Sequence, residues 1–242
     1  MSFILKKCWR FIWKSTICFF AISIGSVILF RFAPIPLTPL MLIRCIEQKI
    51  DSKEIKLKKE WVPLNEISPN LQLAVVCSED QNFINHNGFD FEAIDRALKY
   101  NENHKKQRGA STISQQTAKN VFLWPGHSWI RKGFEVYFTF LIETIWNKKR
   151  IMEVYLNVIE MGDGVYGTQA TATSFFHKDA KNLTQTDAAL IAAVLPNPIK
   201  FSAAKPSSYT RSRQAWILNQ MRLWGGELKY DLKEEMVKEN KK

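Results

Sequence analysis

Apolar residues are distributed in two ways along the chain: one long run near the start, and shorter periodic stripes after it. The run is apolar from residue 15 to residue 30 apart from small hydroxyl side chains. With its extensions to residues 11 and 33 it reaches the length of about 20 residues that a bilayer crossing needs. Lys14 is tolerated near its end because a lysine stem can snorkel toward water. The pattern predicts one N-terminal transmembrane helix.

The stripes after residue 34 recur every three to four residues, which is the period of an amphipathic helix. The clearest stripe covers residues 129–146 and consists of Ile130, Phe134, Tyr137, Leu141 and Ile145. Cap signals predict further helix starts at Thr38-Pro39, Ser68-Pro69 and Thr184, and a last helix is predicted over residues 206–224. Strand signals are few, so the pattern predicts a mostly α fold.

The chain divides into three segments on this pattern. Residues 1–33 form a cytoplasmic N-terminus and the anchor, residues 34–60 a membrane-proximal helix and charged linker, and residues 61–242 the main domain. The helix predicted over residues 40–49 either lies on the membrane surface or packs as an ordinary helix, and both readings stay open. A cleaved signal peptide is the alternative to the anchor, but no small-x-small cleavage site follows the apolar run.

The basic residues around the apolar run predict its orientation. Four of them precede the run, whereas only Arg31 follows it closely. By the positive-inside rule the N-terminus then lies in the cytoplasm and the main domain outside. In a bacterium this corresponds to a single-pass protein of the inner membrane with a periplasmic domain.

The charge balance predicts anionic partners without choosing among them. The chain has 34 basic and 23 acidic residues and a net charge of +11, of which residues 1–33 contribute +5. Phosphates, anionic lipids and nucleic acid all fit the remaining excess. Cys45 and Cys77 are predicted to be buried thiols rather than a disulfide, and the histidines show no zinc-ligand spacing. Each histidine, His86 included, is read as a surface or capping residue.

The stretch from Val75 to Asp90 holds the first candidate for chemistry. A helix is predicted to lead from Ser68 into Glu79, after which Asn85, Asn87 and Gly88 signal turns. Glu79 therefore lies where a buried element opens into a loop. A half-desolvated carboxylate at such a place has a raised pKa and suits a general base. The plainer alternative is a helix end with solvated acids.

The stretch from Gly109 to Asn120 holds the second candidate. Gly109 allows close backbone approach to a ligand, and a helix start beside Ser111 and Thr112 predicts an anion site. Further along the helix, Gln116 and Lys119 are three residues apart and share a face. Amides beside a lysine suit a diphosphate. Any one of these residues also fits a solvated amphipathic helix.

The two stretches together resemble the peptidoglycan glycosyltransferases, the lipid II polymerases of glycosyltransferase family 51. The first motif of that family is matched by Glu79, Asp80, Phe83, His86 and Gly88. The second is matched by Gly109, Ser111, Thr112, Gln115, Gln116, Lys119 and Asn120. The third is matched by Arg131, Lys132 and Glu135, the fourth by residues 150–157 with Gly162 and Gly167, and a fifth by residues 195–198. The matches run in order from about Trp61 to about Ser202.

The resemblance implies a two-lobed helical domain with one lobe similar to lysozyme. It further implies that lipid II is polymerised into glycan strands with β-1,4 linkages, that the donor anomeric carbon is inverted, and that undecaprenyl diphosphate is released. By resemblance Glu79 is the general base on the acceptor hydroxyl. Lys119 and Arg131 would hold the donor diphosphate, with Ser111, Gln116 and Asn120 nearby. Because the 242 residues leave no room for a transpeptidase domain, a monofunctional form is expected.

Glu135 is the second catalytic carboxylate in this interpretation, and its role stays open. It either binds the diphosphate through a divalent metal, Mg²⁺ or Mn²⁺, or orients the basic residues around it. No cofactor is required otherwise. The expected partners are lipid II, the growing glycan strand and the membrane, with cell-division or elongation proteins as candidate recruiters and no nucleic acid.

Two alternatives from other classes remain. A lysozyme-like wall hydrolase also needs carboxylates in a cleft, but it has no use for an anion site at Lys119 and Arg131. A membrane-tethered polyanion-binding module predicts salt-sensitive binding and tolerance of changes at Glu79. Residues 101–108 are predicted to form a mobile loop, either a lid or a plain solvated loop, and the tail after Tyr230 to fray.

Overall fold

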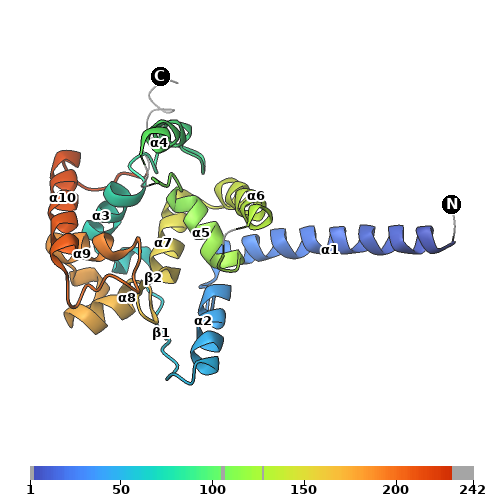
Figure 1. Ribbon diagram of the computed structural model, residues 1–242, viewed down its shortest axis with the longest axis horizontal. Coiled ribbons are helices and arrows are strands. Elements are labelled where there is room, and N and C mark those ends of the chain that lie inside the picture. Colours follow the sequence, from blue (N-terminus) through green and yellow to red (C-terminus); the bar gives the residue numbers. More distant parts are fainter. Residues whose placement is uncertain (1–2, 105–106, 127, 231–242) are drawn as a thin grey trace.

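A computed structural model describes residues 3–104, 107–126 and 128–230 and shows a mostly helical chain, as predicted (Figure 1). The α-helices are α1 Phe3–Phe32, α2 Pro39–Ile50, α3 Pro69–Glu79, α4 Phe91–Asn103, α5 Ile113–Phe122, α6 Trp129–Ile145, α7 Lys148–Val158, α8 Thr168–Thr171, α9 Gln185–Val194 and α10 Ser208–Trp224. The strands β1 Lys58–Lys59, β2 Glu160–Gly162 and β3 Val165–Tyr166 form a small sheet in the order β1-β3-β2. In it β3 pairs parallel with β1 and antiparallel with β2.

Helix α1 projects from the rest of the chain, with its N-terminal end far from the other helices (Figure 1). It is long and apolar enough to cross a membrane, as the apolar run predicts. Its last turns are fixed to the domain by polar contacts. The indole Nε1 of Trp146 donates to the carbonyl of Val27 at 2.8 Å. The guanidinium of Arg150 donates to the carbonyls of Phe30 and Ala33, which the helix end leaves without intrahelical partners.

Helix α2 begins where the sequence predicts, with the Thr38 hydroxyl accepting from the backbone N–H of Met41. It packs against the domain, and its position on a membrane surface stays a prediction. Met41 is buried in the core, whereas Leu42 and Ile46 are exposed. One side of α2 therefore packs on the domain, and an apolar part of the other side is free to meet a lipid surface.

Six of the remaining helices pack in two groups of three that share one core. Helices α3, α9 and α10 contact one another, and α5 contacts both α6 and α7. Buried side chains of both groups, such as Val75, Ile142 and Ile191, join a single hydrophobic cluster. The candidate residues lie where the groups meet, because Glu79 ends α3 while Gln116 and Lys119 lie on α5. The likeness of one lobe to lysozyme stays a prediction.

Three local predictions need correction or completion. Ser68 precedes α3, but its buried hydroxyl donates to the carbonyl of Leu183 at 2.7 Å and does not cap the helix. Residues 101–103 form the last turn of α4 instead of opening a loop. At the other end of that segment, Arg108 lies beside Asn101, whose side chain exchanges two hydrogen bonds with its backbone. Residues 105–106 of the predicted loop and the predicted frayed tail, 231–242, lie outside the described residues.

Candidate active site

Glu79 ends helix α3, where the buried run stops and the chain turns into polar sequence, as predicted. Its side chain is 15% exposed, with its Oε1 atom 3.9 Å from Nη2 of Arg213. Its Oε2 atom accepts a hydrogen bond of 3.1 Å from Nε2 of Gln116. Burial raises the pKa of Glu79, and the Gln116 hydrogen bond and the Arg213 charge offset part of that rise. A carboxylate in this state is suited to accept a proton near neutral pH.

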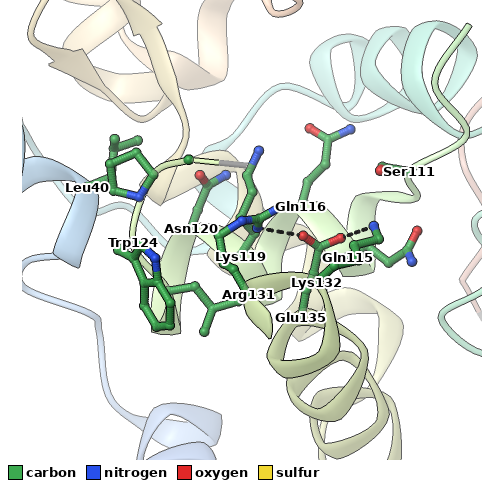
Figure 2. A pocket seen from close by; sticks show the side chains of 13 residues that line it. Leu40, Ser111, Gln115, Gln116, Lys119, Asn120, Trp124, Arg131, Lys132 and Glu135 are labelled. Atoms are coloured by element: carbon green, nitrogen blue, oxygen red, sulfur yellow. Dashed lines mark hydrogen bonds and ion pairs between the residues drawn. The ribbon is translucent and has the colours of Figure 1, made fainter. Parts of the chain in front are cut away.

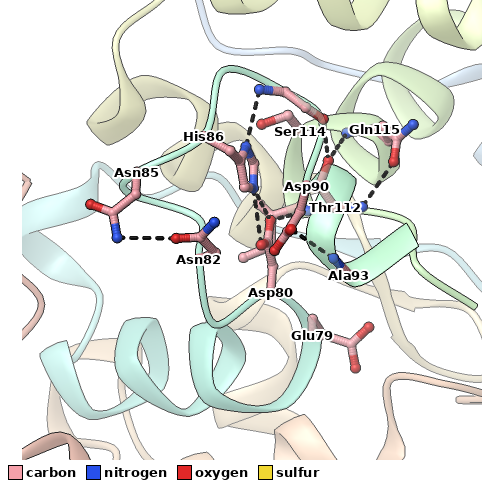
Figure 3. A network of polar contacts seen from close by, with 12 residues as sticks. Glu79, Asp80, Asn82, Asn85, His86, Asp90, Ala93, Thr112, Ser114 and Gln115 are labelled. Carbon is pink, nitrogen blue, oxygen red and sulfur yellow. Dashed lines mark hydrogen bonds and ion pairs between the residues drawn. The ribbon is translucent and has the colours of Figure 1, made fainter. Parts of the chain in front are cut away.

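Asp80, the next residue, points away from Glu79 into a buried polar network (Figure 3). The backbone N–H of Gly88 donates to Nδ1 of His86, so Nε2 of that ring carries the proton and donates to Asp80 at 3.0 Å. Asp80 also accepts from the backbone N–H of Ile113 at 2.9 Å. The prediction of His86 as a surface or capping histidine is wrong, because the residue is 7% exposed and its ring links Asp80 and Gly88 within the first motif.

Gly88 closes this network on the side of α6. Its φ of 89° lies in the left-handed region, and a Cβ atom there would come within 2.8 Å of the Thr139 side chain. Its carbonyl accepts a 2.7 Å hydrogen bond from the hydroxyl of Thr112. The motif therefore needs glycine here, and the resulting turn fixes the position of Glu79 relative to α5.

Helix α5 does not offer the anion site that its start predicts. The helix begins at Ile113, and Thr112 and Gln115 cap each other's backbone N–H groups in a capping box. Since Asp80 takes the N–H of Ile113, the first donors of the helix are used within the protein. Ser111 lies just outside the cap with its side chain exposed to the cleft.

A cavity of about 460 Å³ opens along α5 and the start of α6 (Figure 2). Its polar lining consists of Ser111, Gln115, Gln116, Lys119, Asn120, Arg131, Lys132 and Glu135, and its apolar lining includes Leu40, Leu123 and Trp124. Glu135 is 3% exposed and accepts from Nη1 of Arg131 at 2.8 Å and from Nζ of Lys132 at 2.5 Å. Arg131 and Glu135, four residues apart on α6, therefore form a buried pair inside the cleft.

The charge in this cavity is unbalanced. Among the described residues that line it, Glu135 is the one carboxylate beside the three cations Lys119, Arg131 and Lys132. Burial lowers the pKa of Lys119, an effect that Glu135 opposes and the two neighbouring cations increase. The cavity is thus built to take an anion, which would relieve the repulsion among the cations.

A second cavity, of about 810 Å³, adjoins the first and holds Glu79. Ser111 and Gln116 line both cavities and so lie between the general-base candidate and the cation cluster. The second cavity is also lined by Arg96, Tyr100, Arg108, Tyr209, Arg213 and Trp216. All seven predicted site residues therefore fall on one continuous cleft: Glu79, Ser111, Gln116, Lys119, Asn120, Arg131 and Glu135.

Comparison with known proteins decides the family. A family model described as transglycosylase matches residues 47–222, which is more than half of the chain and includes all seven predicted site residues. The chain belongs to the transglycosylase family. This confirms the resemblance drawn from the motifs, and with it the enzyme class, a peptidoglycan glycosyltransferase.

Relatives of this transglycosylase family member are similar over nearly their whole length. A biosynthetic peptidoglycan transglycosylase of Bacteroides thetaiotaomicron is 57% identical over 219 residues, which is 90% of this chain and 88% of the relative. The one of Bdellovibrio bacteriovorus is 55% identical over 212 residues, 88% of this chain and 85% of the relative. The one of Haemophilus influenzae is 51% identical over 218 residues, 89% of each.

The sequence reasoning gave no role to three residues that lie in or behind the transglycosylase cleft. Arg213 lies in the predicted last helix, but no local signal places it beside Glu79. Tyr155 was matched only within the fourth motif, residues 150–157, and given no role, although its hydroxyl reaches Gln116. Lys132 was matched to the third motif but given no role, and a spacing of three to Glu135 on one helix was the signal that could have found it.

Proposed function

We propose that this protein polymerises lipid II, with Glu79 as general base on the acceptor sugar and the cation cluster holding the donor diphosphate. The observation that carries the proposal is the position of Ser111 and Gln116 between the two cavities. A base on one side and an anion site on the other, with two polar side chains between them, suit a reaction that joins two sugars and expels a diphosphate.

The reaction takes one step in this geometry. Glu79 takes the proton of the 4-hydroxyl of the acceptor as its oxygen bonds the donor anomeric carbon. The bond from that carbon to the diphosphate breaks, and Lys119 and Arg131 stabilise the charge that develops on the leaving oxygen. Attack comes from the face opposite to the leaving group, so the anomeric centre is inverted and a β-1,4 linkage forms.

The anion cavity also suits the lipid part of such a donor. Leu40 and Trp124 lie at its apolar side, and Leu40 belongs to the first turn of α2 directly after the anchor. A lipid-linked diphosphate has the same order of parts, with a charged group joined to a long apolar chain. The polyprenyl chain would leave the cavity past Leu40 toward the membrane.

The contact of the anchor with α6 supports a domain that dips partly into the outer side of the bilayer. The hydroxyls of Ser23 and Tyr137 lie 2.8 Å apart, and Ser23 is ten residues before the end of the apolar run. At 1.5 Å per residue this places Tyr137 roughly 15 Å below the point where the anchor leaves the hydrocarbon. The exposed side chains of Trp129 and Ile130 on α6 then meet lipid. The basic N-terminus lies in the cytoplasm and the cleft faces the periplasm.

A divalent metal at Glu135 does not fit the donor set. Both carboxylate oxygens are taken by Arg131 and Lys132, and three cations surround the cavity. Across the part of the chain that the structure describes, no group of three or more acidic, histidine or cysteine side chains could hold a metal ion. Glu135 instead orients Arg131 and Lys132 toward the diphosphate, which was one of the two roles left open for it.

Polymerisation of labelled lipid II by the full chain in detergent, followed by gel separation of the glycan products, tests the proposal. Ladders of long strands are expected from the wild type and no ladder from Glu79→Gln. A folded preparation that leaves lipid II intact and instead digests purified cell wall would establish the hydrolase. Salt-sensitive binding of polyanions with neither activity would establish the binding module.

A further inference from the structure

Gln116 links Glu79 through hydrogen bonds to Tyr155, which is not one of the seven predicted site residues. Its Nε2 donates to Oε2 of Glu79 at 3.1 Å, and its Oε1 accepts from the hydroxyl of Tyr155 at 3.3 Å. The three residues come from α3, α5 and α7 and form one chain of hydrogen bonds across the core. Tyr155 has no exposed surface, and Gln116 is the one partner of its hydroxyl among the described residues.

The direction of every hydrogen bond in this chain is fixed. An ionised carboxylate can only accept, so the NH₂ group of Gln116 must face Glu79 and its carbonyl must face Tyr155. The phenol must then donate. Burial raises the pKa of Tyr155 well above its ordinary value, so the hydroxyl keeps its proton across the working pH range. If the amide turned round, the hydroxyl would have to accept from the NH₂ group, and its own O–H would lose its one acceptor among the described residues. The cost of leaving that buried donor unpaired holds the amide in its orientation.

We propose that Tyr155 is a positioning residue for the general base: through Gln116 it keeps Oε2 of Glu79 occupied and leaves Oε1 as the oxygen that takes the proton. Oε1 is the atom that faces Arg213 in the cavity, so the acceptor hydroxyl approaches from that side. The inference rests on the proposed function and adds to it which oxygen acts and what holds the other.

The phenol matters most after the proton has moved. In the wild type the amide of Gln116 offers only N–H groups to Glu79, and these favour the ionised carboxylate. Without the Tyr155 hydroxyl the amide is free to turn its oxygen toward a protonated Glu79 and accept from it. The protonated form of Glu79 then gains a hydrogen bond that it lacks in the wild type. The pKa of Glu79 is therefore higher in the variant.

Tyr155→Phe tests this, with Tyr230→Phe as the matched control. The hydroxyl of Tyr230 also donates to a glutamine side chain, Oε1 of Gln72 at 2.7 Å, but it lies outside both cavities of the cleft. Each variant removes one phenolic oxygen and one hydrogen bond to an amide. The full chain is used in detergent, and kcat and KM for lipid II are measured from about pH 5 to 9.

For Tyr155→Phe we expect the acid limb of the kcat profile to move up by about one pH unit or less, with KM unchanged. The Tyr230→Phe profile stays at the wild-type position. Equal profiles for Tyr155→Phe and the wild type, or equal shifts in both variants, would overturn the inference.

Infrared titration of the protonated carboxyl band of Glu79, assigned by its loss in Glu79→Gln, provides a second readout that needs no activity. The band is expected to persist to higher pH in Tyr155→Phe than in the wild type. In a Gln116→Ala background the further change Tyr155→Phe should move the band no more, because the link is gone. A band that moves in a chain without polymerase activity would refute the proposed function alone. A band that stays in place in an active chain would refute the role of Tyr155 alone.

Discussion

The two carboxylates of the cleft should respond in opposite ways to the same substitution, glutamate to glutamine. Glu135 is the shared partner of two cations, and its side chain and that of Arg131 are 4% and 9% exposed. Glu79 has only an amide as its close partner, with Arg213 at 3.9 Å. Glu135→Gln therefore removes the counter-charge of a buried cation, whereas Glu79→Gln removes a charge that burial disfavours.

The magnitudes follow from this difference. Removing one partner of a buried ion pair costs about 3–5 kcal/mol, and the lower end fits Glu135 because Lys132 is 40% exposed and can be rehydrated. At about 2–4 °C per kcal/mol for a domain of this size, Tm falls by roughly 6–12 °C. Glu79→Gln lowers kcat by about 10²–10⁴-fold, the range that a general base contributes.

Stability at Glu79 changes in the other direction. Because the folded-state pKa of Glu79 is raised, the folded protein holds this proton to higher pH than the unfolded chain, whose carboxyl titrates near its ordinary value of about 4.3. Between those two pKa values the free energy of unfolding decreases as pH rises. At neutral pH the ionised Glu79 therefore costs stability, and Glu79→Gln should leave Tm unchanged or raise it.

Thermal unfolding and lipid II polymerisation, measured on both variants in one detergent at pH 7.5, check this pair of predictions. Inorganic pyrophosphate should raise Tm more for Glu135→Gln than for the wild type, since the anion replaces the lost counter-charge. The reasoning is refuted if Glu135→Gln has the Tm of the wild type while the Tm of Glu79→Gln is well below it. It is also refuted if Glu79→Gln keeps the turnover of the wild type.

Three further predictions concern other groups of the molecule. The acid limb of kcat should lie above the ordinary glutamate pKa of about 4.3, because burial raises the pKa of Glu79; a limb at or below that value in a pH–rate profile would contradict the account. Lys119→Ala should lower kcat by about 10²–10³-fold, because it removes a positive charge that stabilises the leaving diphosphate. Tm should stay nearly unchanged, because the ion-pair partners of Glu135 among the described residues are Arg131 and Lys132; loss of Tm alone would mark Lys119 as structural. Arg150→Ala should lower the free energy of unfolding by about 1–3 kcal/mol through lost bonds to Phe30 and Ala33, and should lower polymerisation more in vesicles than in detergent, where the anchor has no fixed direction.

Features with a local cause could be predicted from the sequence. Glu79 was placed correctly because an apolar run before it and turn formers after it leave little choice of position. Gln116 and Lys119 were placed on one face because helix geometry fixes residues three apart. The capping of α2 and α9 was predicted for the same reason, since a cap involves only the residues beside it.

Features that depend on residues distant in sequence could not be predicted. The start of α5 has the sequence of an anion site, but Asp80 arrives from another element and takes the first donor. His86 resembles any histidine in a turn until Gly88 and Asp80 fix its two nitrogens. Arg213 comes to Glu79 only because α10 packs on α3 and α9. In each case the packing of helices, which a local pattern does not contain, decides the partner.

Because the anchor is attached to the domain by polar contacts, the height of the cleft above the bilayer depends on bilayer thickness. Arg150 and Trp146 tie the last turns of α1 to the domain, so the cleft cannot slide along the helix to a new height. A membrane thicker than the apolar length of α1 would draw the cation cluster toward hydrocarbon, and a thinner one would lift it away from the headgroup layer that presents the substrate. A flexible tether would absorb such hydrophobic mismatch. With a rigid one, we expect KM to depend on acyl-chain length and the rate of glycan synthesis to depend on the lipid composition around the enzyme.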